Sequence, residues 1–133
     1  MLLVKESIDG KEQVILCVNA SLKRKAKNLI ILNVKEYSSF ADYFIICSGT
    51  SDRQVQAITA AIQDNLKEYG IMPLGIEGEQ LGKWVLMDYE DVIIHIFYAP
   101  VREFYDIERL WSDAPRMEVG DGVTELAALD KGM

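Results

Sequence analysis

The sequence predicts a single α/β domain with a mixed sheet of five strands flanked by helices. The 133 residues suit one domain, and half of them are apolar, which is enough for one core. Helical periodicity alternates with short β-branched runs in the order α-β-β-α-β-β-β-α. No window approaches the ~18 uninterrupted apolar residues of a membrane span.

The first predicted helix runs from Gly10 to Ala26, with apolar residues at helical spacing and basic residues in its last turn. Two strands follow, NLIILNVKE (28–36) and DYFIICSG (42–49), joined by the turn YSSFA. Their composition is β-branched and leucine-rich, which is typical of buried strands.

The second predicted helix runs from Ser51 to Tyr69, and its apolar residues keep to one stripe. Ser51 and Gln54 have the spacing of a capping box, in which the hydroxyl accepts from a helix amide and the Gln side chain reaches back to the cap. Gly70 stands where a glycine commonly ends a helix.

Three further strands are predicted at 73–79, 82–89 and 91–99. Short connections between them indicate antiparallel neighbours. The run VIIHIF is apolar on both faces, so we expect it near the centre of the sheet. Pro100 opens a third amphipathic helix, which the pattern extends to Trp111. We expect the domain to span residues 1–115 and residues 116–133 to form an irregular tail.

The net charge of −7 is unevenly distributed. Residues 1–35 carry seven Lys and Arg against three Asp and Glu, a net +4, while residues 36–133 carry seven against eighteen, a net −11. The only basic cluster is LKRKAK at 22–27, which either complements a helix dipole, the simpler interpretation, or contacts nucleic acid. The acidic body favours a basic protein partner.

A small turn within CSGTSDRQ (47–54) lies where a strand passes to a helix, as in many phosphate-binding loops. Helix capping explains the turn without a ligand. Catalysis of phosphate transfer would also need Mg²⁺ held by carboxylates two residues apart on a neighbouring strand, and Glu77 and Glu79 have that spacing. A glycine lies between them and the turn has no lysine, so the pattern favours the capped helix.

His95 is the only histidine and is buried by pattern. Metal sites need several ligands, and nothing in the spacing joins Cys47 and Asp88 to His95 as a nucleophilic triad. We therefore expect a neutral core imidazole hydrogen-bonded to a carboxylate or a backbone group. Cys17 and Cys47 lack CxxC spacing, so we expect buried free thiols rather than a disulfide or a metal site.

The segment GKWVLMDYED (82–91) carries large apolar groups on both faces of one strand. Trp84, Leu86 and Asp88 point one way, and Val85, Met87 and Tyr89 point the other. Core burial and a protein interface explain this pattern equally well, because Trp and Tyr beside acidic residues are typical of interface anchors.

Charged residues lie opposite the apolar stripe of the third predicted helix. Ion pairs at spacings of three and four residues, exposed to solvent, explain them. These residues are Arg102, Glu103, Asp106, Glu108 and Arg109.

From Leu22 to Pro115 the sequence resembles the Iojap-like, ribosomal silencing factor family. The motifs that carry the resemblance appear in order: SSFADYF, SGTS, EG, WVLxDY, DVIIHxF and RxxYxxExLW. The resemblance implies a nucleotidyltransferase-like fold that has lost catalysis, so we expect no enzyme activity, no cofactor and no metal.

The resemblance also implies a function. Members bind the large ribosomal subunit through the ribosomal protein numbered fourteen in its series, which blocks subunit joining and represses translation. A part in subunit maturation, a cytoplasmic location and a homodimer in the free state are implied as well, with no membrane and no sequence-specific contact with nucleic acid.

Site residues follow from the same resemblance. The residues expected to bind the partner are Trp84, Leu86, Met87, Asp88 and Tyr89, with Asp91 and Glu77 as a charged rim. The residues expected to support that surface are His95, Tyr105, Glu108 and Trp111.

Two other hypotheses remain open at this point. One is an active nucleotidyltransferase that uses the Ser48–Ser51 turn with Glu77, Glu79 and a divalent metal. The other is a dimeric adaptor that does not contact the ribosome.

Overall fold

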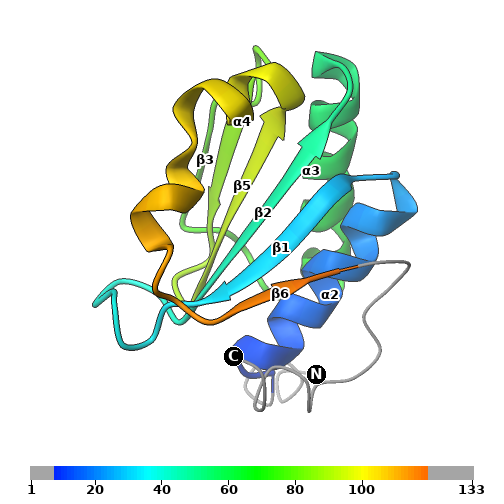
Figure 1. Cartoon of the computed structure of the whole chain (residues 1–133). Helices are drawn as coiled ribbons and strands as arrows, with labels where there is room; N and C mark the ends of the chain where they lie inside the picture. Colours follow the sequence, from blue (N-terminus) through cyan, green and yellow to red (C-terminus); the bar gives the residue numbers. More distant parts are fainter. Residues whose placement is uncertain (1–7, 120–133) are drawn as a thin grey trace.

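The structure, a computed structural model, describes residues 8–119. They form a six-stranded mixed sheet in the order β3-β4-β5-β2-β1-β6, with helices on both faces (Figure 1). The elements are α2 (Gly10–Lys23), β1 (Lys27–Asn33), β2 (Tyr43–Gly49), α3 (Asp52–Lys67), β3 (Gly75–Glu77), β4 (Trp84–Asp88), β5 (Val92–Tyr98), α4 (Ala99–Tyr105), the 3₁₀ helix η1 (Ile107–Trp111) and β6 (Arg116–Glu118). The predicted α/β class is confirmed, with one more strand than expected.

The two central strands, β2 and β5, run parallel, from Tyr43 beside Val92 to Gly49 beside Tyr98. The strands on either side of this pair, β1 and β4, are antiparallel to their neighbours, and β3 pairs antiparallel with β4. The predictions of antiparallel strands after the second helix and of a central VIIHIF run are therefore confirmed. Apolar runs suit these positions because both faces of a central strand are covered.

The inner face of the sheet is covered by α2 and α3, which lie side by side behind the strands in Figure 1. Each helix buries one stripe of apolar residues, including Val14 and Val18 from α2 and Ile58 and Ile62 from α3. They pack against alternate residues of the central strands, and this layer forms the larger core cluster.

The outer face is covered in part by α4 and η1, drawn in yellow and orange in Figure 1. Phe44, Ile46 and Phe97 form the centre of a smaller apolar cluster there. Val101 and Trp111 pack against this cluster, but neither α4 nor η1 contains a fully buried residue. The outer face is therefore only partly shielded.

The prediction of one helix from Pro100 to Trp111 was wrong, because the chain breaks at Asp106. Asp106 adopts a left-handed conformation (φ 44°), and its N–H donates to the carbonyl oxygen of Arg102 at 2.8 Å, which ends α4. A 3₁₀ helix then runs from Ile107 to Trp111.

The expectation that the chain is irregular from residue 116 was wrong for Arg116–Glu118. These residues form β6, the sixth strand, with Met117 opposite Ile31 of β1. A three-residue strand is too short to produce a recognisable alternation, so the pattern missed it. The expectation for residues 120–133 lies outside the described residues.

Candidate functional site

A surface on the outer face joins β3, β4 and α4. Leu86 lies opposite His95 of β5 and Glu77 of β3, so alternate residues of these strands share one face. Trp84, Leu86 and Asp88 are half-buried there, and Glu77 is exposed. Two exposed aromatic residues of α4 extend the surface, since Tyr105 lies 5.0 Å from both Trp84 and Phe104 between ring centroids. The outer-face patch comprises Glu77, Trp84, Leu86, Asp88, Phe104 and Tyr105.

The side chain of Trp84 is fixed on three sides. Its ring stacks on Phe97 at 4.9 Å between centroids and contacts Tyr105. Its indole N–H donates to Nδ1 of His95 at 3.1 Å. The indole is therefore held in one orientation while part of its surface remains exposed.

His95 is buried, with 8% of its surface exposed, among aromatic rings. Burial lowers the pKa of its imidazole from 6.5 to about 4, so the ring is neutral at neutral pH. An indole N–H only donates, so Nδ1 is the acceptor and Nε2 carries the proton. The prediction of a neutral core imidazole agrees with this geometry, but its partner is an indole rather than a carboxylate or the backbone.

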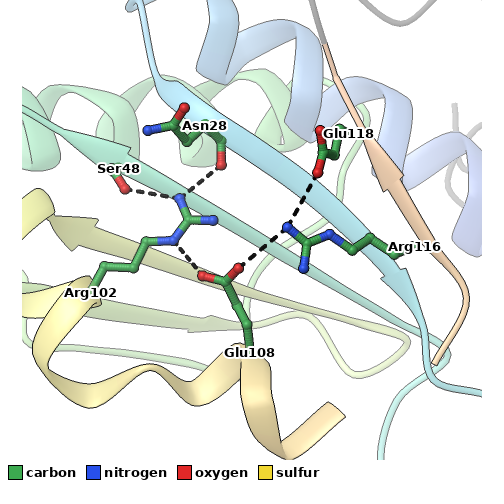
Figure 2. Close-up of polar contacts among 6 residues, drawn as sticks. All are labelled: Asn28, Ser48, Arg102, Glu108, Arg116 and Glu118. Carbon is green, nitrogen blue, oxygen red and sulfur yellow. Dashed lines mark hydrogen bonds and ion pairs between the residues drawn. The ribbon is translucent and has the colours of Figure 1, made fainter. Parts of the chain in front are cut away.

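Arg102 ties α4 to the sheet and to η1, as Figure 2 shows. Its Nε lies 2.6 Å from Oε2 of Glu108, and one terminal nitrogen donates to the carbonyl oxygen of Asn28 and to Oγ of Ser48 at 2.7 and 2.9 Å. Glu108 also lies 3.7 Å from Arg116 of β6. This network fixes the segment that carries Phe104 and Tyr105.

The solvated pairs that the sequence predicted at this segment are present only in part. Arg109 lies 3.8 Å from Asp106 three residues earlier, and both side chains are exposed. Arg102 and Glu108 instead pair across the break between α4 and η1, six residues apart, with 11% and 18% of their side chains exposed. Sequence spacing missed this pair because it assumed a continuous helix.

The model of a protein family described as ribosomal silencing factor during starvation matches residues 7–131. The chain belongs to this family. A ribosomal silencing factor RsfS of Halalkalibacterium halodurans is 40% identical over 112 residues, which cover 84% of this chain and 96% of that protein. A Bacillus subtilis protein of the same name is 40% identical over 102 residues, covering 77% and 86%.

A solved structure with a related sequence has the same fold. A crystal structure of a Chromobacterium violaceum protein is 34% identical, with a TM-score of 0.77, and the likeness covers 88% of this chain and 90% of that one. The predicted membership of the Iojap-like and ribosomal silencing factor family is thus confirmed.

Two of the residues expected to bind the partner are instead buried in the core. Met87 and Tyr89 point to the inner face, where 0% and 5% of their surfaces are exposed. This corrects the sequence prediction, because neither side chain is available to a partner. Asp91 is exposed but lies away from the outer-face patch, beside the start of α2. A Cβ added to Gly10, the first residue of α2, would lie 3.7 Å from the Cβ of Asp91.

The residues expected as supports lie around the outer-face patch. His95 and Tyr105 contact Trp84, and Glu108 belongs to the Arg102 network. Trp111 packs edge-on against Phe44 at 4.8 Å between centroids. Sequence reasoning missed Arg102 and Phe104, although both lie in the segment that carries the family motif RxxYxxExLW.

The turn at residues 48–51 is held by protein contacts. Ser48 accepts from Arg102, and Oγ of Ser51 accepts from the N–H of Gln54 at 3.0 Å. The predicted capping box is only half formed, because Oε1 of Gln54 accepts from the N–H of Thr50 at 2.6 Å instead of from the cap residue.

The carboxylate pair that catalysis would need is not on one strand. β3 ends at Glu77, and the chain turns at Gly78 (φ 85°), so Glu79 lies beyond the strand. Across residues 8–119, no group of three or more His, Cys, Asp and Glu side chains is placed to hold a metal ion.

Both cysteines are buried free thiols, as predicted. Burial raises the pKa of the Cys47 thiol to about 12 and that of Cys17 further, so neither forms a thiolate readily. In the described part of the chain, no helix has the length and apolar character needed to cross a membrane.

Proposed function

We propose that this protein binds the large ribosomal subunit through the outer-face patch and thereby prevents the subunits from joining. The observation that carries the proposal is Trp84, a half-exposed indole held in one orientation by His95 and two aromatic rings. Fixed aromatic side chains at the centre of a surface are typical anchors of protein interfaces. Family membership directs the proposal to the ribosome.

The chemistry of the patch fits a basic protein. Glu77 and Asp88 flank the apolar centre, and residues 36–133, which contain the patch, carry seven Lys and Arg against eighteen Asp and Glu. Opposite charges speed association and orient the partners. The ribosomal protein numbered fourteen, which the family resemblance implies, is the partner we propose, in the cytoplasm.

Binding alone suffices for this function. A body about 30 Å across that sits on the subunit interface blocks closure by its volume, so we propose that no substrate is transformed. The cavity beside Ser48 is consistent with this, since its lining carries three carboxylates, from Glu103, Asp106 and Glu108, against one guanidinium, that of Arg102. Such a lining disfavours a nucleotide phosphate. Tight Mg²⁺-dependent nucleotide binding in a calorimeter would instead support the nucleotidyltransferase hypothesis.

Cosedimentation with purified large subunits tests the proposal. We expect the protein to pellet with large subunits and not with small subunits, and the variant Trp84→Ala to lose most of this binding. A protein that stays in the supernatant would contradict ribosome binding and favour the adaptor hypothesis. We also propose a homodimer in the free state, which equilibrium sedimentation without ribosomes tests.

A further inference from the structure

An exposed basic turn connects α2 to β1. It contains four cations within five residues, all exposed: Lys23, Arg24, Lys25 and Lys27. The chain as a whole carries a net charge of −7, so this turn is a local positive region on an acidic protein. Such clusters attract polyanions even when the net charge of the protein is negative.

The backbone of the basic turn is held in a strained shape. Lys25 and Asn28 adopt left-handed conformations, with φ of 62° and 48°. A lysine adopts this region at a cost of ~1–2 kcal/mol, whereas an asparagine adopts it more readily, so the surrounding contacts must stabilise Lys25 in particular.

Gln54 supplies these contacts. Its side-chain N–H₂ donates to the carbonyl oxygens of Arg24 and Lys25, at 3.0 and 2.9 Å. Its Oε1 accepts from the N–H and the hydroxyl of Thr50. One side chain of α3 thus clamps the basic turn to the turn after β2. The cations are presented from a preordered backbone, which reduces the entropy lost on binding a ligand.

The four cations of the basic turn are free to bind an anion. Among residues 8–119, no ion pair involves these four cations. No intramolecular carboxylate therefore has to be displaced before a phosphate binds.

The basic turn is separate from the outer-face patch. Lys27 lies opposite Ser48 at the end of β2, whereas Trp84 and Leu86 lie on β4, with β5 and β2 between β4 and β1. At about 4.8 Å between strands, β1 and β4 are roughly 14 Å apart. The two surfaces share no residue.

We propose that the basic turn binds the phosphodiester backbone of ribosomal RNA without reading its sequence. This inference rests on the proposed function, which brings the chain to a surface rich in RNA. The segment LKRKAK has no aromatic side chain to stack on bases, so phosphate contact is the interaction it offers. The outer-face patch then anchors the protein to a basic protein, and the basic turn sets its orientation on the subunit.

The test compares two variants with the same change in charge. Arg24→Gln with Lys25→Gln removes two cations of the basic turn, and Lys35→Gln with Lys67→Gln removes two exposed cations elsewhere. Binding to purified large subunits is measured between 50 and 200 mM KCl. We expect the first variant to bind roughly tenfold more weakly at 100 mM KCl. The plot of log K against log salt concentration should become less steep by about 1.5, as the loss of two phosphate contacts requires. The control variant should stay within twofold of the wild type.

Equal effects of the two variants would overturn the proposal. So would weaker binding by the first variant with an unchanged salt slope and unchanged RNA binding, which would point to an acidic protein as the partner of the basic turn.

A second assay separates this inference from the proposed function. Wild type and both variants are titrated against a fluorescent 20-base-pair RNA duplex at 20 mM KCl and, separately, against the isolated basic ribosomal protein. We expect only the first variant to lose RNA affinity, at least fivefold, with equal affinity of all three for the ribosomal protein. If the first variant alone loses RNA affinity but the wild type does not bind large subunits, the proposed function is refuted and the inference stands. If the wild type binds large subunits but both variants bind RNA as the wild type does, the inference is refuted and the proposed function stands.

Discussion

The indole N–H of Trp84 donates a hydrogen bond to Nδ1 of His95 at 3.1 Å, which joins a half-exposed residue on β4 to a buried residue on β5. The two residues are neighbours on the outer face, since His95 lies opposite Leu86 and Phe97 lies opposite Trp84. The imidazole accepts the hydrogen bond of the indole while Phe97 and Tyr105 contact the indole ring. The only histidine of the chain therefore orients the residue that we propose as the anchor.

Truncation of Trp84 tests the anchor. We expect Trp84→Ala to weaken binding to large subunits by about 2 kcal/mol or more, because a central aromatic contact is lost. Titration against labelled subunits measures the change, and circular dichroism verifies the fold. The variant Trp84→Phe keeps a ring but not the N–H, so its loss should be smaller. Unchanged affinity of a folded Trp84→Ala protein would remove Trp84 from the interface.

The stability of the protein should fall in mild acid because of His95. Its pKa is about 4 in the folded protein and 6.5 as a free side chain, so the unfolded state binds the proton more readily. The stabilisation is complete above pH 6.5 and is lost as the pH falls toward 4, by at most about 3 kcal/mol. Urea unfolding between pH 7.5 and 4.5 measures it. The variant His95→Asn keeps an acceptor but does not titrate, and parallel curves for both proteins would contradict this assignment.

The partly buried network of Arg102 should stabilise the fold far more than the exposed ion pair beside it. We expect Arg102→Ala to lower the free energy of unfolding by about 2–3 kcal/mol, because Glu108 and Ser48 lose a charged partner in a poorly solvated site. The matched control, Arg109→Ala, breaks the exposed pair with Asp106 and should cost less than about 0.5 kcal/mol. Equal costs in urea unfolding would show that the network does not stabilise α4 and η1.

Gly78 should tolerate no side chain. A Cβ at this position would overlap the carbonyl oxygen of Trp84, and the φ of 85° is unfavourable for other residues. We expect Gly78→Ala to destabilise the protein by about 2–4 kcal/mol and to weaken subunit binding by moving Trp84. A Cβ on Gly75, in the edge strand β3 just before this turn, would meet nothing within 4 Å, so Gly75→Ala is the control. A Gly78→Ala protein as stable as this control would refute the clash.

Phe104 should contribute to binding without contributing to stability. It is 80% exposed at the edge of the outer-face patch, and Phe40, in the loop before β2, is 83% exposed. We expect Phe104→Ser to weaken subunit binding by about 1 kcal/mol and Phe40→Ser to leave it unchanged, with little change in unfolding for either. Stronger binding loss from Phe40→Ser would place the docking surface elsewhere.

Periodicity and composition were sufficient for the larger elements. The stripe of α3, the two-sided apolar run of β5 and the short turns before it each reflect local burial, which the sequence records directly. The break at Asp106 was not predictable in this way, because an apolar stripe continues across it. Half of the stripe proved to be exposed, namely Phe104, Tyr105 and Leu110, and a tertiary contact between Arg102 and Glu108 stabilises the bent form.

The candidate site was predictable in its location but not in its composition. Alternation along β4 correctly separated Trp84 and Leu86 from Met87 and Tyr89, but the pattern did not reveal which face the helices cover. The strand positions of Arg116–Glu118 and the pairing of Trp84 with His95 depend on contacts between distant residues, which no local pattern encodes.

The rate of subunit joining tests the central claim most directly. Purified large and small subunits are mixed at a Mg²⁺ concentration that supports association, and light scattering follows the reaction with and without an excess of the protein bound beforehand to the large subunit. We predict slower joining and a smaller final amplitude with the wild type, and a nearly normal rate with Trp84→Ala. Joining at the same rate with and without the wild-type protein would contradict the account.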